Sequence, residues 1–286
     1  MNNREDPTAK NNERWDLLAD IHVKAAEDGT AGIYDLKALR AGESSLFPIE
    51  RSELPDLNGK RVLHLQCHFG MDSVSIARTG AEVVGVDFSA NAIVAASKIA
   101  RELKVNASFI QCDIYKLIDT IPDEMETFDF VFTSHGALCW LSDIKAWGQI
   151  IAFFLKPGGQ FYVIDSHPFS YIFDNEEETM DFKLRTPYFN DGKAFRYESE
   201  GSYIDENITN NPSIAKTVSY EWYHTLSEIV MALIDAGLSI EFLHEHAEAS
   251  WQAFKYAKRV ENDLWVIDQD GLNIHLSFSI LAKKSL

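Results

Sequence analysis

Two aspartates stand at the ends of short apolar runs of the kind that form buried β-strands. Asp87 ends the run EVVGVD, and Asp113 ends the run ASFIQCD. Since a carboxylate offers two acceptor oxygens, Asp87 is a candidate acceptor for both hydroxyls of a ribose. Asp113 is a candidate acceptor for the amino group of an adenine, with Ile114 lining the base and Phe88 stacked beside it. For each acid taken alone, the alternative role is a helix N-cap.

A third candidate contact for a ligand is the segment Gln66-Cys67-His68-Phe69-Gly70, which continues the apolar run RVLHLQ. We predict a tight loop that opens a helix, because the free N–H groups at a helix start can face a ligand. Gly70 has no Cβ and therefore allows the backbone to approach closely. This loop and the two aspartates together suit a cofactor that contains adenine and ribose.

Two histidines are candidate catalytic bases. His135 and His167 follow the fourth and fifth β-type runs, and an imidazole exchanges protons near neutral pH. The alternative for each is a hydrogen bond that holds a loop. His244 and His246 share one face of a predicted strand, but no third ligand at motif spacing accompanies them, so no metal site is predicted.

Aromatic residues near these runs are candidates for a substrate pocket. We assign Tyr34, Trp140, Tyr171 and Trp222 to substrate binding, because aromatic rings bind apolar and cationic groups. The alternative is that such rings belong to the core.

The elements that would position these residues follow from the alternation of apolar patterns. From Arg61 onward, β-type runs alternate with helical patterns over residues 71–79, 90–103 and 144–155, and the turn Lys156-Pro157-Gly158-Gly159 precedes the fifth run, QFYVID. This alternation is typical of right-handed βαβ units and a parallel sheet. Ligands of such a sheet bind beyond the carboxyl ends of its strands, where the candidate residues stand.

We expect a disordered tail followed by a single domain over residues 13–286. The expected parts are the tail (1–12), N-terminal helices that cap the core (13–60), the cofactor-binding core (61–165), an insertion that covers the substrate (166–223) and the C-terminal part of the sheet (224–286).

In this combination the core resembles the class I S-adenosylmethionine-dependent methyltransferases. The matching segments are VLHLQCHFG (62–70), GVDFS (85–89), QCDIYKL (111–117), FDFVFTS (128–134) and LKPGGQF (155–161). The resemblance implies a doubly wound (Rossmann-like) α/β fold with a seven-stranded, mostly parallel sheet whose last strand, HLSFSILAKK, is antiparallel. It also implies S-adenosyl-L-methionine as the cofactor. The implied cofactor contacts are Trp15, Gln66, Cys67, His68, Gly70, Asp87, Phe88, Asp113, Ile114 and Ser134.

The loop after the first run departs from the family pattern, which is Asp-x-Gly-x-Gly-x-Gly. His64, Gln66 and His68 stand in place of the acid and two of the glycines. Because most contacts of this loop in the family use backbone groups, Gln66 and Cys67 are still expected to offer a carbonyl to the ammonium group of the cofactor. The resemblance also implies that Trp15, in an N-terminal helix, folds over the cofactor.

The composition excludes several classes of partner. The chain has 286 residues, of which 46% are hydrophobic, and a formal net charge of -18. Nucleic acids and anionic membranes bind basic surfaces, so neither is expected as a partner. No apolar run approaches the length of a membrane span. Cys67, Cys112 and Cys139 are an odd set without metal-ligand spacing, which favours reduced thiols and a cytoplasmic protein.

These observations favour an S-adenosylmethionine-dependent methyltransferase that acts on a small-molecule acceptor. The identity of the acceptor, the catalytic base and the oligomeric state stay open. The alternative is a protein that binds S-adenosylmethionine or S-adenosylhomocysteine without catalysis. An NAD-dependent oxidoreductase is less favoured, because the pyrophosphate motif Gly-x-Gly-x-x-Gly does not follow the first run.

Overall fold

The computed structural model of the chain describes residues 5–30, 32–173, 182–199, 202, 204 and 216–286. Its main sheet has seven strands: β1 (Arg61–Leu65), β2 (Glu82–Asp87), β3 (Ala107–Gln111), β4 (Phe128–Ser134), β5 (Leu155–Ser166), β8 (Leu238–His246) and β14 (Ser277–Lys284).

The order of these strands is β3-β2-β1-β4-β5-β14-β8. The pairs β1–β2, β2–β3 and β4–β5 are parallel, whereas β14 runs antiparallel to both β5 and β8. The predicted fold class is confirmed, including the antiparallel last strand inserted next to β5.

The chain packs as two compact units. Unit 1 comprises residues 1–46, 56–121 and 194–221, and unit 2 comprises residues 47–55, 122–193 and 222–286. The segment that we predicted as one insertion, residues 166–223, therefore divides between the two units.

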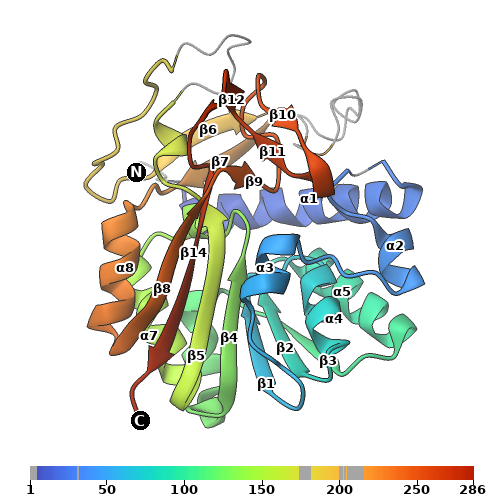
Figure 1. Cartoon of the computed structure of the whole chain (residues 1–286). Helices are drawn as coiled ribbons and strands as arrows, with labels where there is room; N and C mark the ends of the chain where they lie inside the picture. The colour runs from blue at the N-terminus through green and yellow to red at the C-terminus, as the bar shows by residue number, and fades with distance from the viewer. Residues whose placement is uncertain (1–4, 31, 174–181, 200–201, 203, 205–215) are drawn as a thin grey trace. The chain divides into compact units, whose positions relative to one another are not determined.

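Unit 1 contains the parallel strands β1 to β3 with helices α4 (Met71–Ala77) and α5 (Ala90–Leu103) beside them (Figure 1). Strands β1 and β2 are almost wholly buried, which agrees with their unbroken apolar sequence. Helix α5 begins within three residues of the end of β2, and the Ser89 hydroxyl caps it by accepting from the Ala92 N–H. The other helices of unit 1 are α1 (Pro7–Asp28), α2 (Leu36–Ala41), η1 (Ile114–Lys116) and α6 (Leu117–Thr120).

Helix α1 begins earlier than the sequence pattern predicts. Residues 7–12, expected to lie in a disordered tail, form its first turns, because Asp6 caps the helix and Pro7 suits its first position. The Asn11 side chain is buried and pairs with both backbone groups of Tyr220: its Nδ2 donates to the carbonyl at 2.7 Å, and its Oδ1 accepts the N–H at 2.8 Å. This amide joins α1 to the antiparallel pair β6 (Phe195–Ser199) and β7 (Thr217–Glu221).

Unit 2 contains β4, β5, β14 and β8 with α3 (Pro48–Glu53), α7 (Ile144–Phe154) and α8 (Leu226–Asp235); the last two lie side by side (Figure 1). The predicted turn over residues 156–159 lies inside β5 instead. The pairing of β4 with β5 shifts register between Phe128 and Phe130, so the extra residues are absorbed as an irregularity of the strand.

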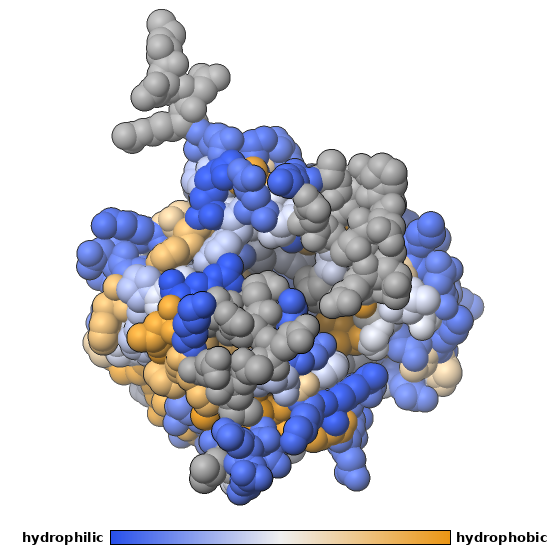
Figure 2. All heavy atoms as spheres, turned by 90° about the horizontal axis from the view of Figure 1, so that it is seen from above, coloured by the Kyte–Doolittle hydropathy of each residue, from blue (hydrophilic) through white to orange (hydrophobic). Residues whose placement is uncertain are grey.

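Short elements between β8 and β14 escaped the sequence pattern, because strands of two residues have no periodicity to detect. They are β9 (Glu248–Ala249), β10 (Lys258–Arg259), η7 (Glu261–Asp263), β11 (Trp265–Val266), β12 (Asp268–Gln269) and β13 (Leu272–Asn273). Phe254 and Ile267 are buried in a small hydrophobic cluster in this part of the chain. Further single turns are η2 (Pro122–Glu124), η3 (Leu138–Trp140) and η4 (Ser170–Ile172). The face drawn in Figure 2 carries many hydrophilic residues with hydrophobic areas between them.

We expect Gly70→Ala to lower the free energy of unfolding by more than Gly59→Ala does. Both glycines have a left-handed φ, 78° at Gly70 and 70° at Gly59, so alanine strains both backbones. A Cβ at Gly70 would lie 2.8 Å from the Ala96 Cβ and 2.8 Å from the Phe109 ring, whereas one at Gly59 meets nothing within 4 Å. Overpacking adds about 1 to 3 kcal/mol to the loss at Gly70. Urea unfolding measures both, and equal losses would contradict this packing.

Candidate functional site

The carboxylate of Asp87, at the end of β2, holds the loop that follows β1. Its Oδ2 accepts the backbone N–H of His68 at 2.9 Å, and its Oδ1 accepts the N–H of Ser89 at 2.9 Å. Burial raises the pKa of Asp87 to about 6, and the backbone hydrogen bonds oppose that rise only in part. The predicted ribose acid is therefore a buried and oriented acceptor.

The loop keeps a tight turn although two of the family's glycines are replaced. Gln66 and His68 adopt left-handed φ values of 57° and 50°. The Cys67 carbonyl accepts the Gly70 N–H at 3.0 Å, and the Cys67 N–H donates to the Val86 carbonyl at 2.9 Å. Because Gly70 has no Cβ, the side chains of Ala96 and Phe109 in unit 1 can pack closely against its backbone.

The side chain of His68 belongs to a cluster of rings from two segments of unit 1. His68 Nε2 and His22 Nδ1 lie 2.9 Å apart, and the ring of Trp15 meets that of His68 edge-on at 5.3 Å. Tyr34 packs against Phe69 with the ring centroids 4.9 Å apart. Burial lowers the pKa of His68 to about 3, so this imidazole is neutral at physiological pH. Trp15 and Tyr34, predicted to face cofactor and substrate, thus lie beside the predicted cofactor loop.

The predicted adenine acid also serves as a helix cap. Asp113 precedes η1, and its Oδ1 accepts the Tyr115 N–H at 3.0 Å. Ile114 beside it is buried, and the Phe88 carbonyl accepts from the Asn12 side chain at 2.8 Å. The structure assigns Asp113 the capping role that the sequence left as the alternative; whether it also contacts an adenine stays a prediction.

A second buried aspartate, in unit 2, organises the loop after β4. Asp165, near the end of β5, accepts three consecutive backbone N–H groups, from Gly136 at 2.6 Å, Ala137 at 3.0 Å and Leu138 at 2.8 Å. Burial raises its pKa, whereas these hydrogen bonds act in the opposite direction. The loop carries His135, which directly follows Ser134, the last residue of β4.

His135 is paired with a carboxylate that the sequence analysis did not single out. Its Nε2 lies 2.7 Å from Oε1 of Glu50, whose side chain is fully buried. Glu50 belongs to the six-residue helix α3, and no motif marked that segment. The available signal was a pair of acids three residues apart, Glu50 and Glu53, on one side of a short helix that starts at Pro48.

Glu53 lies beside the two histidines, His244 and His246, that share a face of β8. Its Oε1 lies 2.7 Å from His244 Nδ1, and its Oε2 accepts from the Tyr162 hydroxyl at 2.7 Å. His246 Nε2 lies 2.9 Å from the Ser279 hydroxyl. The two imidazoles thus take part in a polar network around one partly buried acid.

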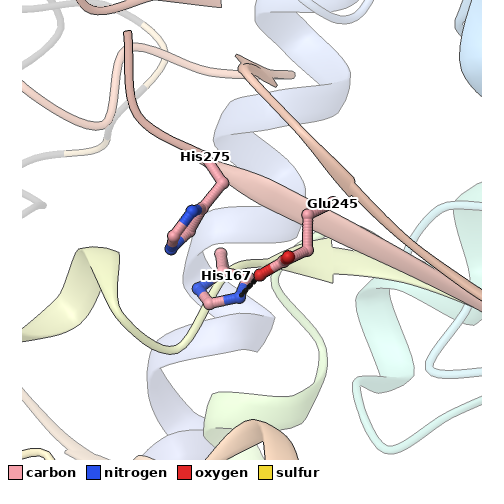
Figure 3. A group of neighbouring side chains, drawn as sticks. All are labelled: His167, Glu245 and His275. Carbon is pink, nitrogen blue, oxygen red and sulfur yellow. Dashed lines mark ion pairs between the residues drawn. The ribbon is translucent and has the colours of Figure 1, made fainter.

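His167, the other predicted base, lies in a group with Glu245 and His275 whose ligand-type atoms come within 4.8 Å of one another (Figure 3). Its Nδ1 accepts the Phe169 N–H at 3.1 Å, and its Nε2 lies 3.0 Å from Glu245 Oε1. An imidazole that accepts through Nδ1 carries its proton on Nε2 when neutral. A metal ion or a substrate proton at Nε2 would need the lone pair of that nitrogen, so this hydrogen bonding suits a structural role.

The remaining predicted substrate residues lie in unit 2 and differ in exposure. Trp222 is 7% exposed, and its backbone N–H donates to the Cys139 carbonyl at 2.8 Å. Tyr171 stacks on Tyr223 with ring centroids 4.8 Å apart, and Trp140 ends η3 with its side chain partly exposed. Contact of these rings with a substrate stays a prediction.

The structure thus groups the candidate residues by unit. Unit 1 holds Trp15, Tyr34, the loop over residues 66–70, Asp87, Phe88, Asp113 and Ile114, whereas unit 2 holds Ser134, His135, Trp140, His167, Tyr171 and Trp222. In each unit, a buried aspartate at the end of a strand fixes a neighbouring loop through backbone N–H groups.

Comparison with known families matches the part of the chain that contains these loops. Residues 62–159 fit the family model described as "Methyltransferase domain". The chain carries a methyltransferase domain. The motif-based resemblance to the class I S-adenosylmethionine-dependent methyltransferases is confirmed, and the domain extends from β1 into β5.

Relatives of this methyltransferase domain share part of their length with the chain. The ubiquinone biosynthesis O-methyltransferase of Alkalilimnicola ehrlichii is 34% identical over 122 residues, which cover 42% of this chain and 48% of the relative. The protein of the same name from Hahella chejuensis is 32% identical over 150 residues, which cover 52% of this chain and 58% of the relative. The chain thus spans about half the length of the curated relatives it matches.

Solved structures agree on the fold. The crystal structure of an S-adenosylmethionine-dependent methyltransferase from Mesorhizobium loti has a TM-score of 0.54 at 19% identity, and the match covers 83% of this chain and 96% of that one. Of the helices that the structure describes, none combines the length and the apolar character needed to cross a membrane.

We expect Asp165→Asn to lower the free energy of unfolding by about 1 to 3 kcal/mol, because the amide nitrogen cannot accept and a buried N–H loses its partner. Asp143→Asn is the matched control. The Asp143 side chain also accepts two backbone N–H groups, from Lys145 and Ala146, but it is exposed, and asparagine is an equally good N-cap. Chemical denaturation that finds equal losses for both variants would contradict the role of Asp165.

Proposed function

We propose that the chain transfers the methyl group of S-adenosyl-L-methionine to a small molecule. The observation that carries the proposal is the buried carboxylate of Asp87, oriented by the amides of His68 and Ser89 within a matched methyltransferase domain. A carboxylate has about four acceptor positions, so these two hydrogen bonds leave acceptor capacity for ligand hydroxyls. Asp87 is therefore suited to bind a ribose.

The acceptor class follows from charge and from the relatives. A formal net charge of -18 disfavours nucleic acid and other polyanions, so we assign a small-molecule acceptor. The two curated relatives are named as O-methyltransferases, which supports oxygen as the methylated atom. A cytoplasmic location belongs to the same proposal and rests on the odd number of cysteines.

Asp87→Ala should weaken S-adenosylmethionine binding by about 1 to 3 kcal/mol, because ligand hydroxyls would lose a buried acceptor. Calorimetric titration of the folded variant measures this, with S-adenosylhomocysteine as a second ligand. Asp35→Ala is the control, since Asp35 is an exposed acid of unit 1 that caps α2. Unchanged affinity in the Asp87 variant would refute its role.

The affinity for S-adenosylmethionine should fall as the pH drops from 7 to 5. The pKa of Asp87 is raised to about 6, so the ligand-free protein holds this group ionised above pH 6 and protonated below it. A ribose donates its hydroxyls to the ionised form, and binding at pH 5 must first remove the proton. The linkage predicts a loss of roughly tenfold between pH 7 and pH 5. Asp87→Ala should remove most of this dependence, and a wild-type affinity that is flat over the same range would contradict the assignment.

Methyl transfer separates this proposal from non-catalytic binding. Incubation with S-adenosylmethionine carrying a labelled methyl group and a set of small hydroxylated compounds should yield a labelled product and S-adenosylhomocysteine. Binding of NAD in place of S-adenosylmethionine would instead favour an oxidoreductase and contradict the proposal.

A further inference from the structure

Two imidazoles of unit 1 form a hydrogen-bonded pair beside the loop after β1. His22, on α1, places its Nδ1 2.9 Å from Nε2 of His68, and its own Nε2 lies 2.8 Å from the Ser202 hydroxyl. All three residues belong to unit 1. The His22 side chain is buried, whereas His68 is partly exposed. The series of hydrogen bonds therefore runs from Ser202 through a buried ring to a ring that keeps some accessible surface.

Both rings are uncharged near neutral pH. Desolvation among the surrounding side chains lowers the pKa of His68 to about 3. Desolvation also lowers the pKa of His22, and His68 and the Arg14 guanidinium act in the same direction. A neutral imidazole carries one proton, so each ring has one donor nitrogen and one acceptor nitrogen. The position of the proton between the two rings thus decides what His68 offers at Nδ1.

The Ser202 hydroxyl favours one of the two possible arrangements. Its oxygen accepts the Ile204 N–H at 3.4 Å, and within the described residues its own proton has His22 Nε2 as the acceptor in reach. If Ser202 donates to Nε2, the proton of His22 is on Nδ1 and is donated to His68 Nε2. The proton of His68 is then on Nδ1. The opposite arrangement would leave the hydroxyl proton without an acceptor, which is unfavourable.

Nδ1 of His68 is available to a ligand. None of the hydrogen bonds among the described residues involves this nitrogen, and the residue is partly exposed. The rings of Trp15, Tyr34 and Phe69 pack around the imidazole at centroid distances of 5.3, 5.7 and 4.6 Å, so its orientation is fixed. A donor that is already held in place loses little conformational freedom when it binds.

The backbone of the loop has few donors left for an anionic group. The Cys67 N–H donates to the Val86 carbonyl, the His68 N–H to Asp87, and the Gly70 N–H to the Cys67 carbonyl. A carboxylate near this loop would also meet the negative charge of Asp87. The imidazole of His68 therefore supplies a donor that these three N–H groups cannot supply.

We propose that His68 donates through Nδ1 to the α-carboxylate of S-adenosylmethionine, and that His22 is the positioning residue that keeps the proton on this nitrogen. The inference rests on the proposed function and concerns the amino-acid end of the cofactor, whereas Asp87 is assigned to its ribose. The ammonium group of the same end is expected at the carbonyl of Gln66 or Cys67, which directly precede His68. An imidazole that stands where related loops have glycine thus adds a donor to the site.

Calorimetric titration of the full chain tests the contact with two ligands, S-adenosylmethionine and its decarboxylated form, which keeps the sulfonium and the ammonium. His68→Ala should weaken binding of S-adenosylmethionine about 10- to 100-fold, the usual range for a hydrogen bond to a charged group. It should leave the affinity for the decarboxylated ligand unchanged. His68→Phe, which keeps a ring at this position, should give the same pair of results. Equal losses for the two ligands would overturn the inference.

Variants on α1 test the role of His22. His22→Leu removes the donor to His68 Nε2 and should weaken binding of S-adenosylmethionine but not of the decarboxylated ligand. His22→Asn should retain most of the affinity, because its amide nitrogen can take the place of Nδ1. Asn11→Leu breaks another buried contact of the same helix and is the matched control, for which the ratio of the two affinities should not change. A ratio that His22→Leu and Asn11→Leu change equally would contradict the positioning role.

The tautomer gives a readout that a merely structural role would not produce. Two-dimensional ¹⁵N NMR of histidine-labelled protein should find the proton of neutral His68 on Nδ1 in the wild type and in His22→Asn, and should find it shifted toward Nε2 in His22→Leu. A wild-type His68 protonated on Nε2 would overturn the inference and leave the proposed function intact. A wild-type protein that binds neither ligand would overturn the proposed function as well.

Discussion

The buried carboxylate of Asp87 is the interaction on which the proposed cofactor site of unit 1 depends. It receives N–H groups from the loop after β1 and from the start of α5, so one side chain ties together the ends of two neighbouring strands. Burial of this acid is unfavourable for its charged form, and the backbone hydrogen bonds offset only part of that effect. A buried acceptor in this state gains from ligand hydroxyls, which add hydrogen bonds without adding charge.

The backbone conformation of the loop after β1 depends on its hydrogen bond to Asp87. For the His68 N–H to reach Asp87, the backbone turns through left-handed φ values at Gln66 and His68, positions where related loops use glycine. Neither residue adopts such values as easily as glycine does. The His68 ring packs among Trp15, His22 and Phe69, and these ring contacts compensate for the strain. In unit 2, Asp165 fixes the loop of His135 by a similar arrangement, in which three N–H groups of that loop donate to the carboxylate.

The parts of the fold that could be predicted from the sequence are those with a clear pattern of apolar residues. Buried strands such as β1 and β2 are unbroken apolar runs, and α5 follows an amphipathic pattern over the predicted residues. Asp87 was recognisable because it ends such a run. Asn11 was not recognisable, since a polar residue in a polar segment gives no sign that its amide will pair with the backbone of Tyr220 more than 200 residues later.

Glu50 illustrates the same limit in the candidate site. Its role depends on an 85-residue separation from His135, and only the folded chain brings the two together. Local sequence predicted the acids of the core because strand ends are local features, whereas pairs formed across the sequence have no local pattern.

A crystal structure of the protein with S-adenosylhomocysteine tests the central claim most directly. The account predicts that the two ribose hydroxyls lie within hydrogen-bond distance of the Asp87 carboxylate, with the amides of His68 and Ser89 still donating to it. A ribose bound elsewhere, or an Asp87 carboxylate that makes no contact with the ligand, would contradict the assignment of this loop as the cofactor site.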